Sequence, residues 1–316
     1  MAQNPRTSET DSDPTTGRNS GFTRRNYVRS FAAVATATTA LGGAGAVSAQ
    51  DDYEVIEAQG QTITIGAGET WENKLIDMTS GQDIVITARD TDWTIRNIGF
   101  KGKNTSGTGT ATFGVADVSG GTSTVENIYL GDGSSTGNTN PNGHGQTAFW
   151  VAPDHSGHID FKNVNIQNFA DNAIYGSAPG TNGGGTIHID SSFAANCYVS
   201  HFRLATEGSK VTNSSVYVDS KDGYVGRGIW AWAPGPIEVS NCQIEMNGNN
   251  NAIVAGANGK PTEVTVTKGD YDDKAGIVEH AGSNVKLGDN VGTNPKAVMP
   301  DGVPTSPEEA ASGGSK

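Results

Sequence analysis

The chain has 316 residues, of which 17% are charged and 34% are hydrophobic, and its formal net charge at pH 7 is −13. This acidic balance argues against nucleic acid and anionic membrane surfaces as partners. The 43 glycines indicate a chain with many tight bends.

Residues 1–49 have the pattern of an export signal. Arg24-Arg25 with Tyr27 and Val28 is followed by a short Ala-rich run over 30–46 and by Val47-Ser48-Ala49. A basic region, a short apolar region and a small-x-small end predict cleavage after Ala49, and the paired arginines resemble a twin-arginine signal. We therefore expect an extracellular or cell-surface protein that has no membrane insertion once the signal is removed. The apolar run is too short and too poor in Leu and Ile for a membrane anchor.

Residues 50–316 keep 16 basic and 31 acidic residues, which gives a formal net charge of −15. An acidic exported chain of this kind resembles secreted proteins of halophilic microbes. An ordinary acidic secreted protein is the alternative. The oligomeric state is not fixed by any sequence feature.

A repeating strand unit occupies residues 50–292. Apolar and polar residues alternate on both sides of a polar bend position, as in His158–Gly176. The unit recurs at gaps of 30, 36, 27, 23, 28 and 27 residues, with bends at Asn97, Asn127, Asn163, Asp190, Asn213, Asn241 and Lys268. Strand-only units of this period predict an all-β fold, a single-stranded right-handed parallel β-helix (solenoid) of about eight coils.

Asparagine at the bend has a physical reason, because it tolerates left-handed backbone angles and its amide bonds to the backbone. Asparagines stacked at one strand spacing are expected to form a ladder. Cys197 and Cys242 fall in different columns of the repeat, so we expect two buried thiols and no disulfide.

The two ends of the solenoid differ from its middle. Tyr53–Ile65 is expected to form the first coil or its cap, although no amphipathic helix is evident there, and open ends would expose edge strands to other chains. Residues 293–316 contain four prolines and a Ser/Gly/Glu-rich end, which predicts a flexible tail.

One column of residues is unusual for a soluble sheet. When the coils are aligned on the strand after the polar break, it holds Trp150, Tyr175, Arg203, Trp230 and Val254. The residue before each is apolar and expected to face inward, so the column is expected to face outward, with Trp232 on the same side. Exposed rings suit sugar faces, and Arg suits the carboxylate of a uronic acid. A register error of one residue would instead place the rings in the core.

Long polar loops precede this column and are expected to wall a groove. They or the neighbouring coils carry His144, Asp171, His201, Asp222 and Arg227. Each also has a structural interpretation: Asp171 and Asp222 suit turns, and His144 and His201 suit loop or flanking positions.

The coil repeat, the Asn bend and the column make the chain resemble the pectate lyase and polygalacturonase superfamily of right-handed parallel β-helices over roughly residues 55–292. The resemblance to lyases implies Arg203 as the base, Asp171 and Asp222 near a Ca²⁺ ion, and a substrate groove along the column. Gly143-His144-Gly145 resembles the polygalacturonase triplet, but no Asp-Asp pair precedes it in a suitable coil and the Arg-Ile-Lys motif is missing.

Two hypotheses follow. The first is an enzyme on acidic polysaccharide, more readily a lyase than a glycoside hydrolase, with Arg203, Asp171, Asp222 and His201 as catalytic candidates. Its metal ligands are not identified, and Ca²⁺ is the candidate cofactor. The second is a non-catalytic glycan-binding or surface protein. In both, the substrate-binding candidates are Trp150, Tyr175, Trp230, Trp232, Arg227 and His144, and the partner is a polysaccharide or glycan.

Overall fold

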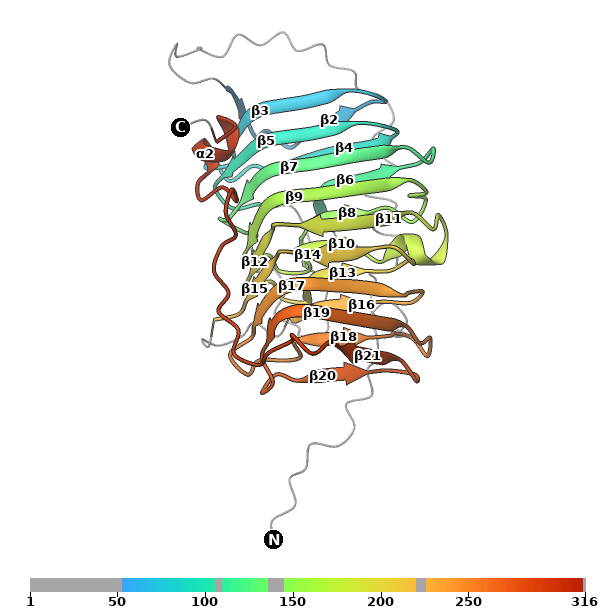
Figure 1. Cartoon of the computed structure of the whole chain (residues 1–316). Coiled ribbons are helices and arrows are strands. Elements are labelled where there is room, and N and C mark those ends of the chain that lie inside the picture. The colour runs from blue at the N-terminus through green and yellow to red at the C-terminus, as the bar shows by residue number, and fades with distance from the viewer. Residues whose placement is uncertain (1–52, 106–109, 136–144, 220–225, 315–316) are drawn as a thin grey trace.

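The computed structural model describes residues 53–105, 110–135, 145–219 and 226–314. Over these ranges the chain is a parallel β-helix, in which two long sheets of parallel strands stack coil upon coil (Figure 1). The expected all-β solenoid is confirmed. The export segment 1–49, His144 and Asp222 lie outside the described residues.

Sheet 1 contributes one strand to each coil and has nine strands in the described ranges, one more than the expected number of coils. In spatial order these are β2 (Gln61–Ile65), β4 (Ile84–Asp90), β6 (Ala111–Asp117), β8 (Thr147–Val151), β10 (Ile174–Gly176), β13 (Ser200–Leu204), β16 (Arg227–Ala231), β18 (Ile253–Ala255) and β20 (Ile277–Glu279).

Sheet 2 lies opposite and carries the bends. Its strands are β1 (Glu54–Glu57), β3 (Thr70–Asp77), β5 (Thr94–Lys101), β7 (Thr122–Leu130), β9 (His158–Gln167), β11 (Thr186–Asp190), β12 (Phe193–Ala195), β14 (Lys210–Thr212), β15 (Ser215–Tyr217), β17 (Ile237–Glu245), β19 (Glu263–Tyr271) and β21 (Asn284–Leu287). The longer strands run through the bend. In two coils the strand breaks there, which gives β11 with β12 and β14 with β15.

The core between the sheets consists of rows that run the length of the solenoid. One row takes a single apolar side chain from each strand of sheet 1: Ile63, Ile86, Phe113, Phe149, Ile174, Phe202, Ile229, Ile253 and Ile277. Within it the rings of Phe113 and Phe149 stack with centroids 4.3 Å apart. Each coil alone could not bury such a face, so the rows are what hold the coils together.

The bend residues adopt the left-handed conformation that the sequence predicts for asparagine. Asn97, Asn127 and Asn163 have φ of 58°, 54° and 53°. In the coil of β11 and β12, however, the positive φ belongs to Ser191 and not to Asp190. That bend is one residue later than expected, because Asp190 ends β11 and uses its carboxylate as a hydrogen-bond acceptor.

An amide ladder joins neighbouring bends in two runs, as expected. The Nδ2 of Asn97 donates to Oδ1 of Asn73 at 2.8 Å, and that of Asn127 to Oδ1 of Asn97 at 2.9 Å. Further along, Asn241 donates to Asn213 at 2.8 Å. Asn213 in turn donates to Oδ1 of Asp190 at 2.7 Å.

Residues 293–314 follow a defined path that differs from the expected flexible tail. The segment leaves the last coil, runs back along the outside of the bends and ends in α2 (Pro307–Ala311) beside β5 (Figure 1). We call it the strap. The Nδ2 of Asn165 donates to the carbonyl of Pro304 at 2.8 Å, and Val303, Ala310 and Ala311 are buried. Its prolines suit an extended segment that docks with little loss of entropy.

The two cysteines are free and buried, as expected. Cys197 follows β12 and Cys242 lies within β17, so the columns they occupy are separate.

Candidate functional site

The predicted column is in register on sheet 1. Tyr175 pairs with Trp150 on one side and with Arg203 on the other, and Arg203 pairs with Trp230. Trp230 then pairs with Val254. The alignment inferred from the repeat is therefore confirmed, because parallel strands at one spacing place equivalent residues in one line.

The column faces away from the main core, also as expected. Its chain neighbours Phe149, Ile174, Phe202, Ile229 and Ile253 belong to the core between the sheets. The column residues instead form two separate outer clusters, one with Trp150 and Tyr175 and one with Trp230 and Trp232. The alternative of a register error is excluded for these strands.

The exposure expected of the column is not observed. Trp150 is 2% exposed, Tyr175 4%, Trp230 2% and Trp232 3%. Small residues that follow the strands pack against the rings, among them Ala178 in the 3₁₀ helix η1 (Ala178–Thr181) and Ala205, Ala233 and Ala257. Alternation along a strand predicts which side a residue faces, but it does not predict what lies over that side.

Arg203 lies between the two clusters and contacts rings of both. Its Cζ is 4.3 Å from the ring centroid of Tyr175, 4.6 Å from that of Trp230 and 3.8 Å from that of Trp232. Its Nε donates to Oγ of Ser177 at 2.8 Å, and the residue is 1% exposed. The π faces stabilise a cation that has lost most of its water. A base must reach the proton it removes, so this position does not favour the base role.

His201 is held by the backbone on both ring nitrogens. Its Nδ1 lies 2.8 Å from the carbonyl oxygen of Arg227, and its Nε2 accepts from the N–H of Cys197 at 3.2 Å. Burial lowers the pKa of His201 to about 4, against the opposing effect of the Arg227 carbonyl. The ring is therefore neutral at pH 7, with Nδ1 as the donor, and the geometry favours a structural role.

Asp171 is also fully buried and accepts a hydrogen bond from Nδ2 of Asn172. Among the described residues, no group of three or more His, Cys, Asp or Glu side chains has the arrangement of a metal site. The Asp171 and Asp222 pair suggested for Ca²⁺ is not tested, since Asp222 lies outside the described ranges.

Arg227 is the half-buried cation of the cluster. It begins β16, and its Cζ lies 4.1 Å from the ring centroid of Trp230, whose own centroid is 4.9 Å from that of Trp232. Tyr198 and Val278 are further part-exposed members of this cluster. The solvent-accessible edge of this cluster, which we call the rim, therefore consists of the Arg227 guanidinium and the apolar side chains of Tyr198 and Val278.

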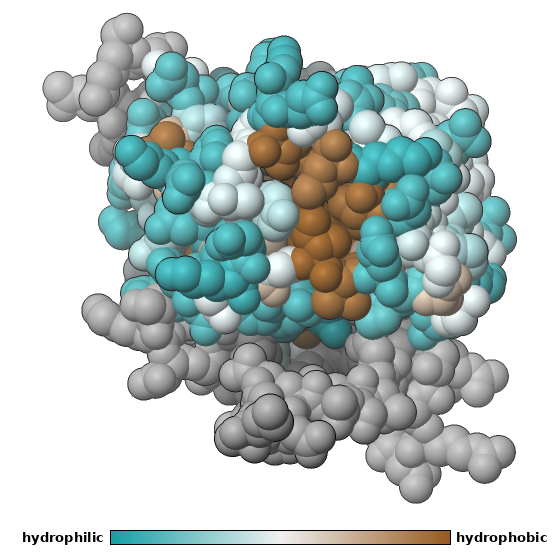
Figure 2. All heavy atoms as spheres, turned by 60° about the horizontal axis from the view of Figure 1, so that its bottom comes forward, coloured by the Kyte–Doolittle hydropathy of each residue, from teal (hydrophilic) through white to brown (hydrophobic). Residues whose placement is uncertain are grey.

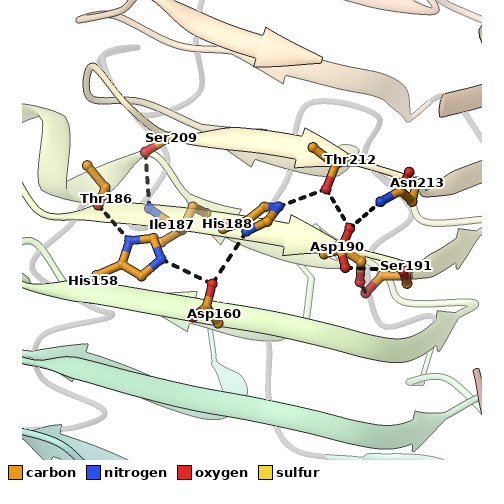
Figure 3. Close-up of polar contacts among 11 residues, drawn as sticks. His158, Asp160, Thr186, Ile187, His188, Asp190, Ser191, Ser209, Thr212 and Asn213 are labelled. Atoms are coloured by element: carbon orange, nitrogen blue, oxygen red, sulfur yellow. Dashed lines mark hydrogen bonds and ion pairs between the residues drawn. The ribbon is translucent and has the colours of Figure 1, made fainter. Parts of the chain in front are cut away.

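A second polar arrangement lies on the outer face of sheet 2 and was not identified from the sequence (Figure 3). His158 and His188 both point a ring nitrogen at Oδ1 of Asp160, at 3.1 and 3.4 Å. Nε2 of His188 also lies 2.7 Å from Oγ1 of Thr212. The available signal was the His-Ile-Asp triplet, which occurs at 158–160 and again at 188–190.

This row is a cross-strand network rather than a cleft. Its side chains come from the adjacent strands β9, β11 and β14, and His188 pairs directly with Asp160. Burial, followed by the charge of Lys210, lowers the pKa of His188, so its ring is neutral at pH 7. The contact of His158 with Asp160 lies within β9, whereas the contacts of His188 with Asp160 and Thr212 join neighbouring coils and account for coil stacking.

No helix in the described part of the chain is long and apolar enough to cross a membrane.

No protein-family model, no curated protein and no solved structure matches the chain. The chain is therefore assigned by its own architecture, as an all-β protein of parallel β-helix form.

Proposed function

We propose that this chain is an exported protein that binds acidic polysaccharide outside the cell without cleaving it. One observation carries the proposal. Residues 50–316 contain four arginines, and two of them, Arg203 and Arg227, pack on the same indole, that of Trp230. In a segment with a formal charge of −15, this places guanidinium groups where rings are also gathered. A guanidinium suits a uronate carboxylate, and the buried ring of Trp230 supports that of Arg227 from beneath.

The two arginines have different roles in this proposal. Arg203 is a positioning residue, because its guanidinium is buried among three rings and fixes their arrangement. Arg227 is the contact residue, because it is half-buried and covers the ring of Trp230. A preorganised rim of this kind loses little side-chain entropy on binding.

A polysaccharide lyase is the second candidate function. It is favoured by the resemblance to β-helix lyases and by the position of Arg203 on the column. It needs a base that reaches the substrate and a cation that stabilises the developing negative charge. Among the described residues, Arg203, Asp171 and His201 are buried and engaged, so binding without cleavage is the better supported function.

The test measures binding and cleavage in one series. Purified protein in about 1 M salt, where exposed charges are screened, is titrated with pectate, alginate and an uncharged glucan. The same mixtures are followed for the ultraviolet absorbance of unsaturated products, with Ca²⁺ and with chelator. We expect binding of the uronate polymers, no binding of the glucan and no product.

Arg227→Ala should weaken uronate binding about tenfold or more, the loss expected for one charge-assisted hydrogen-bonded contact. Arg96→Ala is the matched control. Arg96 is paired with Glu72 on sheet 2, on the other side of the solenoid, and its removal should leave binding unchanged. Unsaturated product that disappears in Arg203→Ala would establish the lyase instead. If Arg227→Ala and Arg96→Ala weakened uronate binding equally, the net charge of the protein would account for binding and the proposed site at Arg227 would be wrong.

A further inference from the structure

In the described part of the chain, no element covers the core at either end of the solenoid. Almost every residue of the main core is buried, but six hydrophobic residues that pack against it are only partly buried. All six lie in the first or the last coil: Ile56, Ile63, Tyr271, Ile277, Val285 and Val291. Figure 2 shows the end formed by the last coil, where a band of hydrophobic residues is framed by hydrophilic ones.

The strands at both ends also have an unpaired edge. In the described residues, β2 begins sheet 1 and β20 ends it, and each pairs with one neighbour. On sheet 2, β1 pairs only with β3, and β21 only with β19. The strap, which could have capped the last coil, runs along the side instead (Figure 1). Unpaired edges beside apolar surface favour pairing with another chain.

The two ends match each other in register. Ile63 and Ile277 are the first and last members of one continuous row of sheet 1. On sheet 2, Leu287 ends a core row whose first described member, Trp71, lies on β3 in the second coil. Leu287 is 44% exposed at the end of its core row, and Ile56 on β1 is only partly buried against the core at the other end.

We propose that the partner of each end is a second copy of this chain, stacked head to tail. In this arrangement the last coil of one copy meets the first coil of the next, with Ile277 over Ile63 and with β20 parallel to β2. The core row of sheet 1 continues across the contact, and the edge N–H and C=O groups of β20 and β2 find partners. The contact is heterologous, so it does not close by symmetry and adds copies in a line.

Charge sets the conditions for this assembly. A formal charge of −13 on each full chain, and of −15 on its residues 50–316, opposes contact at low ionic strength, while salt screens exposed charges beyond about 3 Å at 1 M. We therefore expect a monomer in about 0.1 M salt and association that grows with protein concentration in about 1 M salt. This inference rests on the ends of the solenoid and not on the proposed glycan site, so the two fail independently.

The experiment is sedimentation velocity on the full chain with one charged substitution at each end. Ile63→Lys blocks the first coil and Ile277→Lys blocks the last. Each alone should stop association, but an equimolar mixture should form a dimer and nothing larger, because only one compatible pair of ends remains. Ile56→Lys and Leu287→Lys are the second pair if the first pair fails to fold. Val298→Lys, at a 68% exposed position of the strap away from both ends, is the control and should associate like the parent.

The outcomes separate the arrangements. Rescue by the mixture supports head-to-tail stacking. If the last-coil variant stays monomeric while the first-coil variant still dimerises, the contact joins two identical ends and the proposal is wrong. A parent chain that stays monomeric at every salt and protein concentration overturns it as well.

Discussion

The Nδ2 of Asn127 donates to the carbonyl oxygen of Ala310 at 3.1 Å, across a separation of 183 residues. This bond ties a bend of the amide ladder to the last turn of the strap. It lies beside the ladder bond from Asn127 to Asn97, so one amide group serves both the coil stack and the strap. The strap is thus held by groups that the solenoid already orders.

Gly99→Ala tests how closely the strap docks. A Cβ at Gly99 would lie 1.8 Å from the carbonyl oxygen of Pro307, so α2 must move. We expect a loss of about 1–3 kcal/mol in the free energy of unfolding and faster proteolysis within residues 293–314. Gly66→Ala is the control, since its Cβ would meet only Oε2 of Glu69 at 3.8 Å. Chemical denaturation checks both, and equal stability would show that α2 does not hold its position on β5.

The ladder is tested by paired substitutions at Asn97. Its φ of 58° costs a residue with a Cβ about 1–2 kcal/mol, and glycine avoids this cost. Both Asn97→Ala and Asn97→Gly lose the bonds to Asn73 and Asn127, worth about 1 kcal/mol each. We expect the alanine variant to be the less stable in urea unfolding. If the glycine variant were as stable as the parent, the ladder bonds would contribute nothing net.

Asp117 gives the protein a defined pH dependence. Burial raises the pKa of Asp117, but hydrogen bonds from the N–H groups of Asp92, Gly121 and Ser119 and from Oγ of Ser123 outweigh it and hold the pKa below 3.8. The carboxylate therefore contributes stability above its unfolded pKa, and this is lost as pH falls through the lower, folded value.

Asp117→Asn should accordingly cost about 1–3 kcal/mol at pH 7 and less near pH 3. Urea unfolding at both pH values measures the difference. The exposed Asp289 supplies the control substitution Asp289→Asn, which should change neither value by much. If Asp117→Asn lowered the free energy of unfolding equally at both pH values, the charge of the Asp117 carboxylate would not contribute to stability.

The thiols should be inert in the folded protein. Burial raises the pKa of both Cys197 and Cys242 to about 12, against smaller hydrogen-bonding effects. Because the thiolate is the reactive form, we expect a thiol reagent at pH 8 to react on the order of a hundredfold more slowly with the native chain than with the unfolded chain. Rapid native reaction of one thiol would show local opening at that coil.

The sequence predicted those features that recur in every coil. The period of the apolar residues fixed the sheet rows, the side that Trp150 and Arg203 face and the αL positions of the asparagines. It did not predict the cover over Tyr175 and Trp230, because small residues such as Ala233 carry no periodic signal. It also missed the path of residues 293–314, since a Pro- and Ser-rich composition is shared by free tails and by extended segments that dock.

In the candidate site, too, the positions of residues were predictable from the repeat and their contacts were not. Residue types and register brought Arg203, Tyr175 and Trp230 together correctly. The roles of Arg203 and His201 depend on their contacts, and those were not predictable: three rings around one guanidinium, and backbone partners on both nitrogens of one imidazole. The row of His158, Asp160 and His188 was missed because the two His-Ile-Asp triplets are not aligned with each other. On the paired strands β9 and β11 the second triplet is shifted by two residues, so that His188 lies opposite Asp160.

The strap changes how unfolding can spread. In a plain solenoid each coil contacts only its neighbours, so either end can fray coil by coil without disturbing the rest. Here the chain leaves the last coil and binds again at β5, near the first. Unfolding from the last coil must release the strap and its contacts on β9 and β17, and unfolding from the first coil must do so once it reaches β3 and β5. The strap therefore converts a linear array of local stabilities into a single cooperative unit.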